Sequence, residues 1–362
     1  METKKTTIGK LRGLANHLPK PIEDGLLQSY RSLNNIKSRV WWKVYLAISN
    51  KKENLIWTKA IKENSPIMKN TKDFIARQFN NRDENLNRYD IIVRYLAIDK
   101  HYNGSSEKIK HDLYEKMQLK RDKEYISKDR ILSLVRSIKE KGYDEKSSIL
   151  VNRLQQLVDG SHRSASALYL DQKQIPIIVH GYNEKVEFGI DWFKKNDFTS
   201  EEIQYLKKMK DEIFIEKGIL FPLILWPTIQ NHFNEIEKKL MKKYRVAKTQ
   251  NILLEDLSKF TKELYTLDDI PMWQINQKIK GMEGKAPNIK ILYIEIPKPK
   301  FRKNENGKKV STTLEGLKSS FRKTYSKKAN IKDFYIMHSP DNFEDNQEAV
   351  KIIKKHATKK NE

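Results

Sequence analysis

The sequence of 362 residues contains no cysteine, which excludes disulfide bonds, thiolate metal sites and catalysis by a thiol. Long apolar runs are also missing. The longest, GILFPLILWPTI at residues 218–229, contains two prolines and is far shorter than the ~20 residues that span a bilayer. The opening segment METKKTTIGKLRG lacks the apolar stretch that a secretion signal needs. We therefore expect a soluble, cytoplasmic protein with no membrane span.

Acidic residues are scarce relative to basic ones, because 47 Asp and Glu face 71 Lys and Arg and the net charge is +24. Clustered cations neutralise nucleic-acid phosphates and release counterions. Lysine is frequent throughout this chain, however. We therefore expect most of the excess positive charge to lie on a solvated surface. The densest segment, residues 298–332, holds twelve Lys or Arg against Glu305 and Glu315. Apolar residues at helical spacing interrupt it, so we expect a folded basic face.

Aromatic residues are plentiful by contrast: six Trp, sixteen Tyr and thirteen Phe are too many for a disordered chain and predict sizeable cores. The length allows two or three domains. Changes of pattern along the chain predict an α+β protein with four regions. These are a helical N-terminal region at residues 1–120, a core at 121–185, a helical connector at 186–217 and an α/β C-terminal domain at 218–362.

Apolar residues at three- and four-residue spacing predict helices at SRVWWKVYLAIS (residues 38–49) and RYDIIVRYLAIDKHY (88–102). The second segment carries Arg88, Asp90 and Arg94. At this spacing Arg88 and Arg94 can share one helix face. They are either an ordinary set of surface ion pairs, which we favour, or part of a site.

The region from 121 to 185 has the most informative pattern. A helix at SKDRILSLVRSIKEKG (residues 127–142) has Ser127 as its N-cap, Asp129 in its first turn and Gly142 as its stop. Short strands are expected at residues 149–151 and 156–158, a helix from Ser161, and a further strand in QIPIIVHGY at residues 174–182. The order is therefore helix, strand, turn, strand, helix, strand.

The segment LVDGSHRSASALYL at residues 157–170 joins the second strand to the second helix. A strand that enters a helix in this way directs the free N–H groups of the first turn, and the positive end of the helix dipole, at one spot. Gly160 permits close approach of the backbone, and Arg163 offers a planar fork for phosphate. Asp159 either holds a metal, accepts a proton or caps the helix. The chemistry suits a phosphate or a nucleotide.

Taken together, SIKEKG (residues 137–142), ILVN (149–152), LVDGSHRSASALYL and IPIIV (175–179) resemble the ParB/sulfiredoxin superfamily. The resemblance covers about residues 120–182 and implies a ParB/sulfiredoxin-like core with an N-terminal and a C-terminal addition. Sulfiredoxins use a cysteine where this chain has Ser161, so the resemblance does not extend to their reaction. The DG-x-HR pattern at Asp159, Gly160, His162 and Arg163 is similar to the free-serine kinases of the superfamily.

Resemblance to the kinases implies binding of ATP with Mg²⁺, with Asp159 as the metal ligand. The implied nucleotide- and phosphate-binding residues are Arg121, Gly160, Ser161, His162, Arg163 and Ser164. The implied catalytic residues are Asp159, His162 and a general base upstream, for which Glu124 is the nearest candidate and Asp122 the alternative. His162 either orients a phosphate, acts as an acid, or is a structural histidine.

The function expected from the resemblance is a kinase that transfers a phosphoryl group to a hydroxyl of a sugar, a polyol or an amino-acid-like metabolite. The flanking regions are similar to bacterial proteins associated with surface-polysaccharide synthesis. A nucleotide and a small-molecule acceptor are therefore the expected partners. The alternative is a ParB-like nucleic-acid-binding protein or nuclease that uses the basic segment at residues 298–332 and binds polynucleotide with steep salt dependence.

The C-terminal domain offers two further candidates. The segment HSPDN at residues 338–342 follows an expected strand in DFYIMH and precedes a helix. His338, Asp341 and Asn342 either serve a second site or form a turn in which Asp341 or Asn342 caps the helix. The adjacent acids of DDIP at residues 268–271 either bind a metal or start a helix.

Overall fold

Helices and sheets are combined in this protein, so the expected α+β class is confirmed. A computed structural model describes residues 66–79, 83–104, 112–121, 128–179, 188–268 and 270–357. The helix expected at residues 38–49, and the candidates Asp122, Glu124 and Ser127, lie outside these ranges. The chain divides into two compact units, one of residues 1–68, 144–161 and 175–186, the other of residues 69–143, 162–174 and 187–362.

The first unit contains most of a four-stranded sheet in the order β1-β4-β2-β3. Its strands are β1 (Ile67–Asn70), β2 (Ile149–Val151), β3 (Leu157–Asp159) and β4 (Gln174–Val179). Strand β2 has the predicted bounds and β3 lies one residue later than predicted. Leu150 of β2 lies opposite Asp159 of the antiparallel β3 and opposite Ile178 of the parallel β4.

The turn between β2 and β3 is set by Asn152. Its side-chain oxygen accepts the backbone N–H groups of Leu154 and Gln156 at 2.9 Å each. Gln155 completes the turn in the left-handed region, with φ of 60°. Asn and Asp favour such turns because their short side chains bond the backbone two residues on. Residue types in the turn therefore fix where β3 begins, and with it the position of Asp159 at its end.

The N-terminal part of the second unit is helical. Its helices are α4 (Thr71–Arg77), η1 (Glu84–Leu86), α5 (Tyr89–Asn103), α6 (Leu113–Arg121), α7 (Asp129–Lys141), α8 (Ser161–Tyr169), α9 (Ile190–Lys195) and α10 (Ser200–Glu216). Helix α5 is central, because α6, α7 and α10 all pack on it. Residues 89–98 are consequently buried on every side of α5, although the segment includes charged side chains.

The predicted end of α7 at Gly142 is confirmed, and α10 begins with a clear capping signal. Gly142 follows α7 with φ of 78°, a conformation that side chains other than glycine rarely adopt. Thr199 and Glu202 form a reciprocal capping box at the start of α10, with bonds of 3.2 and 2.7 Å. Helix α5 ends in the same manner at Gly104, with φ of 63°.

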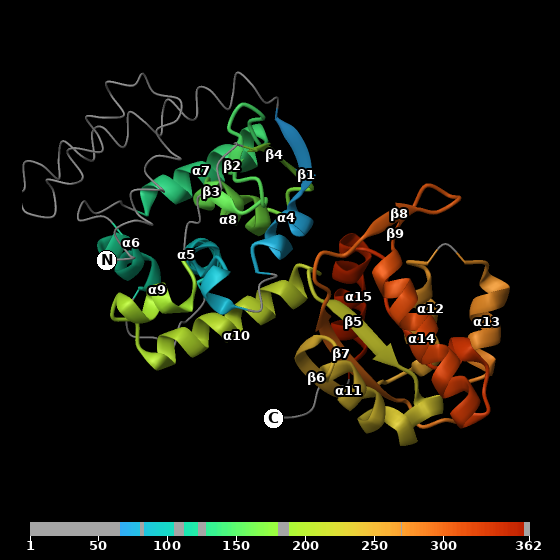
Figure 1. The fold of residues 1–362 in the computed structure, drawn as a ribbon. Coiled ribbons are helices and arrows are strands. Elements are labelled where there is room, and N and C mark those ends of the chain that lie inside the picture. Colours follow the sequence, from blue (N-terminus) through green and yellow to red (C-terminus); the bar gives the residue numbers. More distant parts are fainter. Residues whose placement is uncertain are drawn as a thin grey trace, which may run out of the picture. The chain divides into compact units, whose positions relative to one another are not determined.

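The C-terminal part of the second unit is built on an antiparallel sheet in the order β10-β5-β7-β6. The strands are β5 (Phe221–Leu225), β6 (Arg245–Leu253), β7 (Asn288–Glu295) and β10 (Met337–His338). All of β5 and residues 289–294 of β7 are buried, so both faces of these strands are covered. Helix α15 packs on β5 and α11 on β6, and Figure 1 shows the sheet between these two helices.

The remaining C-terminal elements flank this sheet. They are η2 (Pro227–His232), α11 (Phe233–Met241), α12 (Leu257–Tyr265), α13 (Met272–Lys280), the hairpin β8 (Phe301–Lys303) and β9 (Lys309–Ser311), α14 (Thr312–Ala329), η3 (Asp333–Tyr335) and α15 (Phe343–His356). The strand expected at DFYIMH is wrong over most of its length, because residues 333–335 form a 3₁₀ turn and only Met337 and His338 pair with β5. Asn342 caps α15, as one of the two interpretations of HSPDN proposed, by accepting the N–H of Asp345 at 2.9 Å.

Within the described ranges, no helix is both long enough and apolar enough to cross a lipid bilayer.

Candidate functional site

The connection from β3 into α8 has the strand–turn–helix form that the sequence predicts. Gly160, with φ of 103°, makes the turn in a region that a Cβ atom strongly disfavours. Asp159 is exposed at the end of β3, and Ser161 starts α8 as a buried residue. Ser164 and Ala165 are also fully buried, so small side chains form the face by which this helix packs.

His162, the second residue of α8, is half-buried and contacts α6. Its Nε2 atom lies 3.0 Å from the hydroxyl of Tyr114, and the two rings meet edge to face with centroids 6.1 Å apart. Gln118 donates to the same hydroxyl at 3.5 Å. Burial, together with the charges of Arg94, Arg121 and Arg130, lowers the pKa of His162 to about 2. The imidazole is therefore neutral at physiological pH, a form in which one ring nitrogen can donate a hydrogen bond and the other can accept one.

Beside this histidine lies a network formed by Arg88, Asp90 and Arg94. Arg88 binds the Asp90 carboxylate with two bonds of 2.8 and 2.9 Å, and Arg94 reaches the same carboxylate at 3.0 Å. The ion pairs favoured from the sequence are confirmed, but their placement on the surface is wrong. The three residues are 3%, 0% and 0% exposed, because helices α6, α7 and α10 enclose α5. The two arginines hold the pKa of Asp90 far below its usual range.

The guanidinium of Arg94 is only partly satisfied by this network. Its Nη1 atom donates to the carboxylate and to the backbone oxygen of Asp90, the latter at 2.8 Å, and lies 3.8 Å from the sulfur of Met117. Its Nε and Nη2 atoms are buried and have no hydrogen-bond partner among the described residues. Leaving a buried donor unpaired costs about 1–3 kcal/mol, and more when the group is charged. An occupant that accepts two hydrogen bonds would remove this cost.

Two further arginines add to the positive charge around His162. Arg121, the last residue of α6, is exposed and its guanidinium lies 4.6 Å from the ring centroid of Phe188. Arg130, in the first turn of α7, is exposed as well. Both act on His162 in the same direction as Arg94. Asp90 acts in the opposite direction but has a smaller effect than any of the three arginines, so the surroundings of this side chain are electropositive.

Two of the residues implied by the family resemblance, Arg121 and His162, are thus brought to one place by the fold. Asp159, Gly160, Ser161, Arg163 and Ser164 occupy the connection into α8 and its first turn, and their roles stay predictions. Glu124 lies outside the described residues. Arg94 belongs to the set that the sequence left open as part of a site, but its complete burial was not predicted. The available signal was its place within residues 91–98, where every other side chain is apolar or aromatic and an unsatisfied charge is costly.

No group of three or more His, Asp or Glu side chains able to hold a metal ion is present in the described part of the chain. The described residues therefore form no ready-made metal-binding site. Mg²⁺ is commonly bound by one or two carboxylates together with substrate phosphates. Asp159 is an exposed carboxylate at the end of β3, and its role as an Mg²⁺ ligand stays a prediction.

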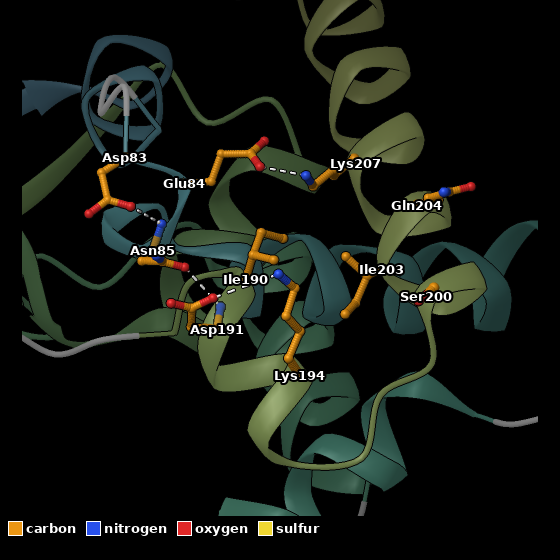
Figure 2. A pocket seen from close by; sticks show the side chains of 10 residues that line it. All are labelled: Asp83, Glu84, Asn85, Ile190, Asp191, Lys194, Ser200, Ile203, Gln204 and Lys207. Atoms are coloured by element: carbon orange, nitrogen blue, oxygen red, sulfur yellow. Dashed lines mark hydrogen bonds and ion pairs between the residues drawn. The ribbon is translucent and has the colours of Figure 1, made fainter.

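A pocket of about 450 Å³ lies elsewhere, at the junction of η1, α9 and α10. Figure 2 shows two ion pairs among its side chains, Lys207 with Glu84 and Lys194 with Asp191. Gly189 permits this junction, since a Cβ atom there would lie 2.2 Å from the backbone oxygen of Asn85. Four of the charged residues that line this pocket are thus paired with one another. None of the predicted site residues lines it.

Acid is expected to destabilise the protein partly through His162. In the unfolded chain this side chain titrates near pH 6.5, whereas in the fold its pKa is about 2. Below about pH 6.5 the unfolded state therefore binds more protons, and the free energy of unfolding falls by up to about 1.4 kcal/mol per pH unit. Urea unfolding of H162Q between about pH 6.5 and 4.5 should show a shallower pH dependence. A slope equal to that of the wild type would contradict the assigned pKa.

The described geometry can bind an anion. It has a neutral histidine, two accessible arginines and one buried arginine with two unpaired N–H groups. The histidine lies in the first turn of α8, directly after the glycine turn. Guanidinium groups match the planar, multidentate geometry of phosphate. No family model, curated protein or solved structure matches this chain.

Proposed function

We propose that the protein is an ATP- and Mg²⁺-dependent kinase that phosphorylates a hydroxyl of a small metabolite, and that its core is of the ParB/sulfiredoxin type. The observation that carries the proposal is Arg94, whose Nε and Nη2 atoms are buried without a partner beside the electropositive surroundings of His162. A phosphate group supplies several acceptor oxygens and negative charge in one ligand. It therefore satisfies both requirements of this cluster.

In this proposal the phosphates of ATP bind at Arg94 and Arg121, with Arg130 at the edge of the cluster. Gly160, Ser161, Arg163 and Ser164 receive their roles from the sequence, since a glycine turn followed by helix N–H groups is a common way to hold phosphate. Asp159 is the proposed Mg²⁺ ligand. When bound with the nucleotide, Mg²⁺ would offset the charge that develops on the phosphate oxygens.

His162 fits this role because its protonation responds to the ligand. Three arginines and burial keep it neutral in the protein alone. A phosphate bound to those arginines cancels part of their charge and favours the imidazolium form, since an opposite charge nearby raises a histidine pKa. His162 then donates a hydrogen bond to the phosphate while Tyr114 holds the ring in place, 3.0 Å away.

The transfer itself follows the general course of phosphoryl transfer. The acceptor hydroxyl oxygen forms a bond to the γ-phosphorus, the bond from that phosphorus to the bridging oxygen breaks, and ADP leaves with the bridging electron pair. The hydroxyl proton passes to a carboxylate, for which Asp159 and Glu124 are the candidates. Arginines that surround the phosphates stabilise the charge of the transition state more than that of the ground state.

Substitution of Asp159 tests the proposal. Transfer of labelled γ-phosphate to a panel of sugars, polyols and hydroxy amino acids, including building blocks of surface polysaccharides, should be detectable with the wild type. It should fall at least ~100-fold in D159N, because the variant loses the proposed metal or proton contact. D144N is the matched control, since Asp144 is an exposed turn residue. A wild type that neither transfers nor hydrolyses the γ-phosphate would contradict the proposal.

The nucleic-acid alternative gains no observation of its own. The basic segment at residues 298–332 is folded, as expected, but several of its cations are used internally. Lys318 donates to the backbone oxygen of Ser339, Lys328 to the carboxylate of Glu235, and Arg302 to that of Glu315. Fewer of these charges are therefore available to phosphates of a polynucleotide than the sequence suggests.

A further inference from the structure

The C-terminal part of the second unit contains buried polar side chains that the proposed kinase does not use. They are Tyr265 at the end of α12, Asp268 in the loop that follows, His338 at the end of β10 and Ser339 just after it. We refer to these four residues as the His338 cluster. Tyr265, His338 and Ser339 are 2%, 1% and 0% exposed, whereas Asp268 is partly accessible.

The fold brings together two segments that the sequence analysis singled out separately, DDIP and HSPDN. The Nδ1 atom of His338 lies 3.6 Å from Oδ2 of Asp268. The Tyr265 ring meets the imidazole edge to face at 4.6 Å, and the Trp226 ring stacks on Tyr265 with centroids 6.0 Å apart. An acid and a histidine are therefore held at one end of the buried sheet by aromatic side chains.

Each member of the His338 cluster has an unsatisfied polar atom. Among the residues described by the structure, no hydrogen-bond partner is found for Oη of Tyr265, Oδ1 of Asp268, Nε2 of His338 and Oγ of Ser339. Buried polar atoms are nearly always paired, and each exception calls for an explanation. Four exceptions in neighbouring side chains point to an occupant that supplies their hydrogen bonds.

Four cations surround the cluster, and two of them are already paired. Lys308 pairs with Asp345 at 3.0 Å, and Lys318 with Asp341 at 3.0 Å. Within the described ranges, no carboxylate lies within ion-pair distance of the other two, Lys278 and Arg322. Both of these side chains are half-buried. Arg322 donates to the backbone oxygen of Met337 at 2.8 Å, a neutral partner that leaves its positive charge uncompensated.

Lys278 is held over the cluster by aromatic contacts. Its Nζ atom lies 4.6 Å from the ring centroid of Tyr265 and 4.7 Å from that of Phe334. Partial burial and the neighbouring cations Arg322 and Lys318 lower the pKa of Lys278 to about 8. A bound anion would reverse that effect, since a negative charge nearby favours the ammonium form.

We propose that the His338 cluster is a second ligand-binding site, which takes a small molecule that carries an anionic group, a phosphate or a carboxylate, and hydroxyl groups. Lys278 and Arg322 bind the anionic group. The buried side chains of Tyr265, His338 and Ser339 form hydrogen bonds with the hydroxyl groups, and Asp268 completes the set at the accessible side. The site is independent of the proposed kinase site, with which it shares no residue.

A purely structural role fits the geometry less well. In a structural pair, Asp268 and His338 would be joined by a hydrogen bond, but their 3.6 Å separation exceeds normal hydrogen-bond length. Burial and the neighbouring Asp341 raise the pKa of Asp268 to about 7, and burial with the surrounding cations lowers that of His338. Near neutral pH both groups can thus donate as well as accept hydrogen bonds.

The test is a titration of the full-length protein followed by nuclear magnetic resonance of its histidine side chains, with His338 assigned from the spectrum of H338Q. The probes are inorganic phosphate, glucose 6-phosphate and citrate. The His338 resonance should move saturably with at least one of them. A response to the first two identifies phosphate as the preferred anion, and a response to citrate alone identifies carboxylate.

Two variants decide the assignment. K278Q should weaken the response at least ten-fold, while K280Q, which changes an exposed lysine of the same helix, should leave it unchanged. R121Q removes a residue of the proposed kinase site and should also leave the His338 response unchanged, so failure of one site is distinguishable from failure of the other. A His338 resonance that stays fixed with all three probes at millimolar concentration, or equal responses in K278Q and the wild type, would overturn the proposal.

Discussion

Replacement of Asp90 by alanine is expected to lower the free energy of unfolding by about 3–5 kcal/mol. Asp90 is fully buried and binds both Arg88 and Arg94, which are 3% and 0% exposed. The variant would leave two positive charges in a water-poor environment with no counter-charge. Removal of one partner from a buried ion pair is costly for this reason, even where the intact pair itself contributes little.

Chemical denaturation of D90A and of a matched variant, D73A, measures this effect. Asp73 pairs with Arg77 at 3.1 Å on the surface of α4, and their side chains are 17% and 29% exposed. Loss of such a partly exposed pair is expected to cost at most about 1 kcal/mol. Equal destabilisation of D90A and D73A would show that the network of Arg88, Asp90 and Arg94 is not buried as described.

Replacement of Arg94 by methionine should lower the free energy of unfolding less than D90A does, but should strongly weaken nucleotide binding. Asp90 keeps its two bonds to Arg88, at 2.8 and 2.9 Å, so the variant retains a paired carboxylate. The unpaired Nε and Nη2 donors disappear, which offsets part of the lost ion pair. R94M is therefore expected to be destabilised less than D90A.

The same substitution should greatly weaken nucleotide binding. Hydrogen bonds to charged groups contribute about 1.5–3 kcal/mol each, and Arg94 offers two such donors to a phosphate. The affinity of R94M for ATP with Mg²⁺ is thus expected to fall at least ~100-fold. A folded R94M that binds ATP as tightly as the wild type would show that the two unpaired donors do not face the nucleotide.

Local features of the fold could be predicted from the sequence wherever the residue type itself sets the backbone. Gly142 after α7, the capping box of Thr199 and Glu202, and the turn at Gly160 are all of this kind. Strand β6 was not predicted, because it lies at the edge of its sheet and its residues are mostly polar or half-buried. The pattern of an edge strand is weak for this reason.

The candidate sites depend on tertiary contacts that periodicity does not reveal. Arg94 is a binding candidate only because α6, α7 and α10 bury α5 on every side. Asp268 and His338 are 70 positions apart in the sequence and meet because β10 joins β5 at the end of the sheet. The types of residue at both sites were visible in the sequence, but their burial and pairing were not.

The central claim, that the cluster of Arg94, Arg121 and His162 binds the phosphates of a nucleotide, is tested most directly by calorimetric titration of the protein with ATP in the presence of Mg²⁺. The account predicts saturable binding to one site in the wild type, at least ~100-fold weaker binding in R94M, and unchanged binding in R136Q, which alters an exposed arginine of α7. Absence of binding to the wild type, or equal affinities of the wild type and R94M, would contradict the account.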